Sequence, residues 1–220
     1  MKNKTKYIAR FFTLISFSLL FCSCLGLNID IALNNNGGGI VSLEYRISQY
    51  LETLGKLDGN EMWNTIPAGR ADFERTLDRL PEMKLLSFSS REDEKDTVIS
   101  ARIEFQNINS LLAFLDAEGS RSSFSGDGRS GRIGFILSEG SSMRDEVFFE
   151  LIRDISASYT VAFNMSFPGE GNLTLNDSQG RTLTDIPGLV LRPSGRNVSV
   201  TLPLYEILSS TEGINLEFSW

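Results

Sequence analysis

The sequence contains no histidine, and its only two cysteines, Cys22 and Cys24, lie near the N-terminus. Without histidine, neither a Ser-His-Asp triad nor a Cys-His pair can form, and zinc sites that use histidine ligands are excluded. No apolar stretch reaches the ~20 residues that a membrane-spanning helix needs. We therefore predict a non-enzymatic protein without a metal site or cofactor.

Positive charge is scarce outside the first 23 residues. That segment carries four cations and no acid, so removing it takes the formal charge from −7 to about −11. An acidic surface repels nucleic acid phosphates, and we expect no nucleic acid partner. The length and the 41% hydrophobic content are typical of one globular domain with its own core.

The N-terminal segment has the order of a secretory signal. A cationic stretch at 1–10 precedes an apolar run at 11–21, and the small residue Ser23 follows. This arrangement is typical of a signal peptide that is removed after export. We predict a signal peptide at 1–23 and a single extracytoplasmic α+β domain at 24–220, joined by a very short tether.

The string Phe21-Cys22-Ser23-Cys24 resembles the lipobox of bacterial lipoproteins. Phe21 stands where leucine is usual, as in the relaxed form tolerated in spirochaetes. The resemblance implies cleavage between Ser23 and Cys24, a diacylglyceryl thioether on Cys24, and a lipid-anchored protein of the cell envelope. Its location would be the outer membrane or the periplasmic face of a membrane. The alternative is a plain signal peptide with incidental cysteines.

Alternating apolar and polar residues predict many short strands. The clearest pair is 27–34 and 39–47, joined by the turn-forming stretch 34–39. Further strands are predicted at 85–90, 97–105, 132–137, 159–167, 173–175, 189–192, 197–201 and 214–220.

Five segments have a helical pattern, namely 50–57, 72–80, 110–116 with Asn109 as N-cap, 143–156 and 203–209. The polar stretch 120–131 is expected to be an exposed loop. We predict an α+β fold: a largely antiparallel β-sheet with a few amphipathic helices packed on one face.

The order of these elements is similar to that of the LppM-type bacterial lipoprotein domain. The similarity covers most of residues 25–220 and is carried by the opening hairpin, the string Phe105-Gln106-Asn107-Ile108-Asn109 and the final strand that ends at Trp220. It implies an α/β fold with a lipid-accommodating cavity or groove in the envelope. It brings no catalytic residue to this sequence.

Apolar residues of the sheet and of the 143–156 helix either fill a core or border a hydrophobic cavity. The candidates are Ile103, Phe105, Phe148, Leu151 and Phe163. We predict an envelope lipoprotein that is anchored to a membrane and binds a lipid or another hydrophobic ligand. The alternative is an envelope scaffold that binds a protein partner. A third hypothesis is a hydrolase that uses carboxylates alone.

Two further motifs favour structural interpretations. Residues 126–131 match G-x-G-x-x-G, but a strand follows them, whereas a dinucleotide site needs a helix there. The acidic run 92–96 lies between two predicted strands and reads as a solvated turn, because acid–base pairs need buried surroundings.

Overall fold

The computed structural model of this protein describes residues 25–48, 67, 69–93, 96–127, 129–140, 150, 153–154 and 156–220. Its strands are β1 (Leu25–Leu33), β2 (Gly39–Ser48), β3 (Met83–Asp93), β4 (Asp96–Phe105), β5 (Ser122–Gly126), β6 (Gly131–Ser138), β7 (Thr160–Asn176), β8 (Val190–Arg192), β9 (Ser194–Pro203) and β10 (Ile214–Ser219). Its helices are α3 (Arg70–Leu77), α4 (Ile108–Leu115) and α6 (Leu204–Ser209).

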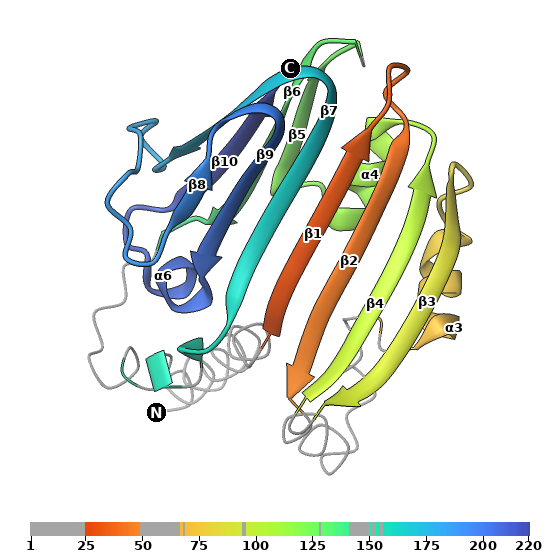
Figure 1. The fold of residues 1–220 in the computed structure, drawn as a ribbon, viewed down its shortest axis with the longest axis horizontal. Helices are drawn as coiled ribbons and strands as arrows, with labels where there is room; N and C mark the ends of the chain where they lie inside the picture. The colour runs from red at the N-terminus through yellow and green to blue at the C-terminus, as the bar shows by residue number, and fades with distance from the viewer. Residues whose placement is uncertain are drawn as a thin grey trace, which may run out of the picture.

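These strands form one curled, mixed sheet (Figure 1). The hydrogen-bonded order is β3-β4-β2-β1-β7-β10-β6-β5, with β9 paired to β7 and β8 paired to β9. Only the β1–β7 pairing is parallel among the described strands. The described part of the chain is therefore an α+β arrangement made mostly of strands, as predicted, and its sheet is mixed because of the β1–β7 pair.

The β1–β2 hairpin follows from the chemistry of its turn. Asn34 receives a backbone hydrogen bond from Asn36 on its side-chain oxygen, at 3.2 Å, and Gly37 has a positive φ of 82°. Asparagine and glycine tolerate such conformations at low cost. Gly39 then lies so close to β1 that an added Cβ would be 2.0 Å from the carbonyl oxygen of Ala32.

Strand β7 joins the part of the sheet formed by β1 to β4 to the part formed by β10, β6 and β5. Residues 161–166 pair with β1, whereas residues 172–176 pair with β10. β9 pairs with both parts of β7, with an irregularity between Ser166 and Gly171. Because β7 has a different neighbour in each half, the sheet curls around it (Figure 1).

The core lies against one face of the curled sheet, because alternate residues of each strand point to it. Val41, Ile103 and Val200 are fully buried there. All three described helices add to the same core, and α3 and α4 lie behind the sheet in Figure 1. The opposite face of β1, β2 and β4 carries mainly polar residues.

Several boundaries differ from those predicted. Helix α4 is capped by Asn107, whose side-chain oxygen accepts from Ser110 N at 2.9 Å, so the predicted cap at Asn109 was wrong. The stretch 120–131 is not a loop throughout, since it contains β5. The predicted strands 159–167 and 173–175 are one continuous strand, β7.

The predicted helix 143–156 lies mostly outside the described residues. Its four described members, Glu150, Arg153, Asp154 and Ser156, are helical. The predicted signal peptide also lies outside the described part of the chain. The short helix expected between 50 and 57 does as well.

Candidate functional site

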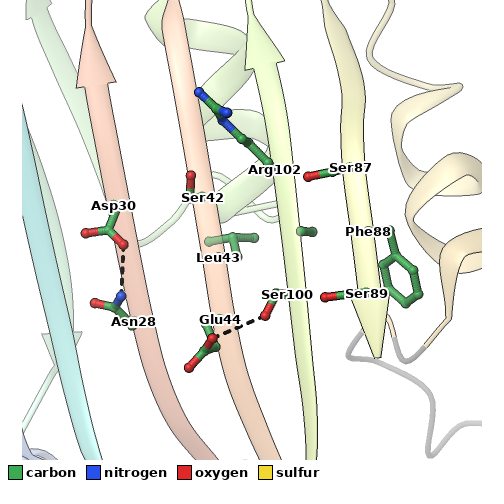
Figure 2. A pocket seen from close by; sticks show the side chains of 11 residues that line it. Asn28, Asp30, Ser42, Leu43, Glu44, Ser87, Phe88, Ser89, Ser100 and Arg102 are labelled. Carbon is green, nitrogen blue, oxygen red and sulfur yellow. Dashed lines mark hydrogen bonds between the residues drawn. The ribbon is translucent and has the colours of Figure 1, made fainter. Parts of the chain in front are cut away.

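A depression of about 270 Å³ lies on the polar face of the sheet. We call it the sheet-face depression, and Figure 2 shows the side chains around it. Four neighbouring strands supply its lining: Asn28 and Asp30 from β1; Ser42, Leu43 and Glu44 from β2; Ser87, Phe88 and Ser89 from β3; Ser100, Ala101 and Arg102 from β4.

Register explains why polar groups gather there. Ser42 is paired with Asp30 on one side and with Arg102 on the other, and directly paired residues share a face of the sheet. The residues between them, such as Leu43 and Ala101, point to the core and are buried. The depression is therefore the outer side of the same alternation that builds the core.

Two hydrogen-bonded groups lie at this face. Asn28 Nδ2 donates to Asp30 Oδ2 at 2.8 Å, and Asn164 of β7 donates to Asp30 Oδ1 at 2.8 Å and to Asn28 Oδ1 at 3.0 Å. On the other side, Ser100 Oγ donates to Glu44 Oε2 at 3.2 Å (Figure 2). These contacts orient both carboxylates along the sheet.

Other polar groups of the depression have no side-chain partner among the described residues. These are the guanidinium of Arg102 and the hydroxyls of Ser42, Ser87 and Ser89. A guanidinium with several free N–H groups can bind a carboxylate in bidentate fashion, and serine hydroxyls can both donate and accept. The arrangement can hold a polar partner, and its two described carboxylates, Asp30 and Glu44, are not buried.

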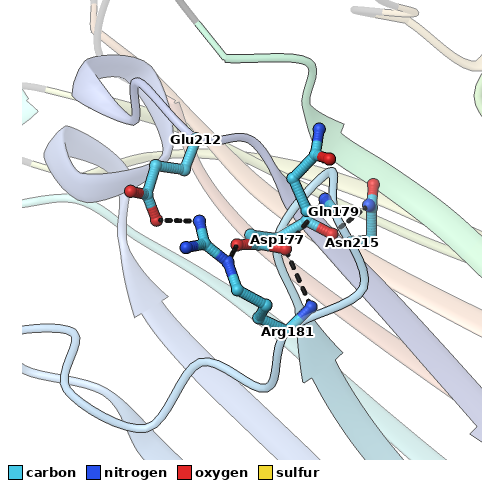
Figure 3. Close-up of polar contacts among 5 residues, drawn as sticks. All are labelled: Asp177, Gln179, Arg181, Glu212 and Asn215. Atoms are coloured by element: carbon cyan, nitrogen blue, oxygen red, sulfur yellow. Dashed lines mark hydrogen bonds and ion pairs between the residues drawn. The ribbon is translucent and has the colours of Figure 1, made fainter.

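A second polar cluster lies at the end of β7, around Asp177, which is 1% exposed (Figure 3). Asp177 accepts hydrogen bonds from Gln179 N at 2.8 Å, from Arg181 N at 2.9 Å and from Arg181 Nε at 2.6 Å. Arg181 also pairs with Glu212 at 3.2 Å, and Asn215 donates to the backbone oxygen of Asp177 at 3.0 Å.

The surroundings of Asp177 favour its charged form. Burial alone would raise its pKa, but the hydrogen bonds from the Arg181 backbone and side chain and from Gln179 lower the pKa below the usual value. The Arg181–Glu212 ion pair and the hydrogen bond from Ser178 N to Glu212 O join the turn after β7 to the segment that precedes β10. We interpret this cluster as a structural clamp rather than as a binding site.

The residues predicted from the sequence as core or cavity are only partly described. Ile103, Phe105 and Phe163 are 0%, 1% and 6% exposed and belong to the core. The ring of Phe163 lies 5.4 Å from that of Phe135, centre to centre. Phe148 and Leu151 lie outside the described residues, as do Ser23 and Cys24.

Both motifs that were interpreted as structural lie in hairpins. Residues 126–131 close the β5–β6 hairpin, in which Gly126 pairs with Gly131 and the side chain of Asp127 accepts from Ser130 N at 3.2 Å. The acidic run spans the end of β3 and the start of β4, where Asp93 pairs with Asp96. Within the described ranges, no group of three potential metal ligands gathers.

None of the helices in the described part of the chain is long and apolar enough to span a bilayer. The sequence reasoning did not single out the sheet-face depression. The strand alternation does show that Ser42 and Glu44 share a face. It does not show that β3 and β4 lie beside them to complete the lining.

Comparison with known proteins adds little. No family model and no curated protein matches the sequence. Among solved structures, the folded domain of LppM from Mycobacterium tuberculosis, determined by NMR, is similar over 82% of this chain and 90% of that one, with 13% sequence identity and a TM-score of 0.36. This similarity is weak and concerns the fold alone, so no residue or function is transferred from it.

Proposed function

We propose that this protein is a non-enzymatic binding lipoprotein of the cell envelope, held at a membrane by a lipid on Cys24. The observation that carries the proposal is the order of the N-terminal sequence: a cationic stretch, an apolar run and a lipobox-like string, followed at once by β1. Each buried CH₂ of an acyl chain contributes about 0.8 kcal/mol, so two or three chains anchor a protein firmly.

Metabolic labelling with a palmitate analogue tests the anchor. The wild-type protein incorporates the label, and Cys24→Ser abolishes incorporation because the acceptor sulfur is gone. Cys22→Ser is the matched control, since residue 22 leaves with the signal peptide and labelling persists. Labelling that requires Cys22 instead of Cys24, or no labelling of the wild type, contradicts the proposal.

For the ligand, we propose a lipid or another hydrophobic molecule, held by apolar side chains of the mature domain. The alternation of the strands supports this proposal, because it gathers their apolar side chains into one extended hydrophobic cluster. Protein that comprises residues 25–220, purified from bacteria, should carry extractable lipid and take up a fluorescent fatty acid. If it does neither, the ligand proposal is wrong and the anchor proposal stands.

The sheet-face depression favours a second candidate, a scaffold that binds a polar protein partner. Its free Arg102 and serine hydroxyls suit a partner segment with carboxylate groups. A photo-crosslinker at Ser87 should then give one defined adduct in cells. Arg102→Glu should abolish that adduct, whereas Arg192→Glu on the exposed part of β8 should not. An adduct that is insensitive to Arg102→Glu rules out this use of the depression.

A further inference from the structure

The proposed anchor enters the fold without a spacer. Leu25, the residue after Cys24, is the first residue of β1 and already pairs with Ile47 of β2. Consecutive Cα atoms are about 3.8 Å apart, so a lipid on Cys24 is held next to the sheet. The side of the domain that meets the membrane is then decided by the end of the sheet at which β1 begins.

Strand register shows which residues lie level with Leu25. Ile47 is its partner on β2, Thr97 is the partner of Ile47 on β4, and Glu92 is the partner of Thr97 on β3. These four positions form one row across the sheet. Its strands are about 4.8 Å apart, so the row is a broad edge rather than a point.

The row continues on the other side of β1. Leu27 pairs with Val161 of β7, so β7 begins level with the start of β1. There, Leu204 N donates to Tyr159 O at 2.9 Å, which brings α6 to the same end. Figure 1 shows α6 and the starts of β1, β4 and β7 together at the lower end of the sheet.

We infer that this end of the sheet, the anchor end, faces the bilayer and that the Asn34–Gly38 turn, at the distal end, points away from it. The inference rests on the proposed acylation of Cys24. β1 has nine residues, so its two ends are about 27 Å apart at the usual rise per residue. The distal turn is therefore well outside the headgroup layer when the anchor end touches it.

The charges at the anchor end indicate the kind of surface that it meets. Asp93 is paired with Arg46 at 3.4 Å and Asp96 accepts from the Tyr159 hydroxyl at 3.2 Å, while Glu92 is exposed. Among the described residues of this end, the carboxylates of Glu92, Asp93 and Asp96 outnumber the guanidinium groups of Arg46 and Arg91, so their charge gives no net attraction to anionic lipid. The acyl chains hold it, and a zwitterionic phospholipid surface suits it.

Site-specific fluorescence quenching tests this orientation in the acylated full-length product. Once Cys24 is lipidated and Cys22 is removed, the mature chain has no free thiol, so a single introduced cysteine takes the label. Glu92→Cys and Ser158→Cys place an exposed label at the anchor end, and Asn35→Cys places one in the distal turn. Each protein is reconstituted into phosphatidylcholine vesicles that contain doxyl-labelled lipid.

Labels at residues 92 and 158 should be quenched several-fold more than the label at residue 35. Equal quenching at all three positions, or stronger quenching at residue 35, overturns the orientation. Mass spectrometry of the same samples separates the two proposals. A protein that carries the diacylglyceryl group but shows reversed quenching refutes the orientation alone, whereas a protein without the group refutes the anchor and the orientation together.

Discussion

At the scale of single residues, Asp177 combines almost complete burial with three hydrogen bonds to its carboxylate. A turn sequence of Asp-Ser-Gln-Gly indicates that this aspartate bonds to nearby backbone N–H groups. The ion pairs that extend the cluster to Glu212 depend on tertiary structure and are not readable from the turn. The clamp around Asp177 should therefore contribute more to stability than a carboxylate in a turn usually does.

Asp177→Asn should lower the free energy of unfolding at pH 6 to 7, because the charge that Arg181 and the backbone N–H groups favour is lost. The folded-state pKa of Asp177 is depressed, so its contribution is present above the unfolded pKa of about 3.9 and disappears as pH falls through the folded-state value. Urea unfolding of the wild type and of Asp177→Asn, at pH 7 and at acidic pH, measures the free energy of unfolding of each protein.

The free energies of unfolding of Asp177→Asn and of the wild type should become more similar as the pH drops below about 4. Asp185→Asn removes an exposed carboxylate and is the matched control, with little effect at either pH. A difference that stays constant over the whole pH range would show that the charge of Asp177 does not contribute to stability.

The cap of α4 gives a second prediction at this scale. Asn107→Ala should destabilise the protein by about 1 kcal/mol, because Ser110 N loses its side-chain acceptor. Asn109→Ala, at an exposed position inside the helix, should be nearly neutral or slightly stabilising. Chemical denaturation measures the free energy of unfolding of both variants. A larger decrease for Asn109→Ala than for Asn107→Ala would contradict the assigned cap.

At the scale of secondary structure, periodicity located most of the described strands. The two hairpins β1–β2 and β3–β4 are confirmed by their register. The strand β5 was missed because its sequence, Ser-Ser-Phe-Ser-Gly, has a single large apolar residue and resembles a loop. β7 was divided in two because Pro168 and Gly169 read as a break, whereas the strand continues through them with an irregularity.

Gly39 is a further test at this scale. Gly39→Ala should destabilise the hairpin strongly, because the new Cβ would lie 2.0 Å from the backbone oxygen of Ala32, which cannot move without disturbing β1. Gly169→Ala is the control, since its Cβ would meet no atom within 4 Å. Thermal unfolding should show a lower Tm for Gly39→Ala only. Similar Tm values for both variants would mean that the strands separate at little cost.

At the scale of the whole molecule, the sequence predicted a sheet with helices on its apolar face but not the neighbours of the central strands. β1 and β7 pair in parallel across more than half of the chain, and nothing local in either sequence specifies that partner. The sheet-face depression could not be predicted for the same reason. Its lining needs β3 and β4 next to β2, and this order follows from the assembled sheet.

Replacing a core ring by alanine tests whether side chains fill the space against the apolar face of the sheet. Phe163→Ala should lower the free energy of unfolding by about 3–5 kcal/mol, as expected for a ring that packs against others in a filled core. Leu86→Ala removes a side chain that is 43% exposed and should cost little. Unfolding in guanidinium chloride measures the free energy of unfolding of both variants. A loss under about 1 kcal/mol for Phe163→Ala would indicate that the ring borders an unfilled cavity instead.

The parallel neighbour of β1 has a mechanical consequence. β1 is a central strand, bonded along its length to β2 on one side and to β7 on the other. If the membrane pulls on its first residue while a bound partner pulls on the far end of the domain, the load runs along the strands. The hydrogen bonds on both sides of β1 are then loaded in shear and must break together instead of one at a time. The domain should therefore resist a high force before β1 separates from β2 and β7.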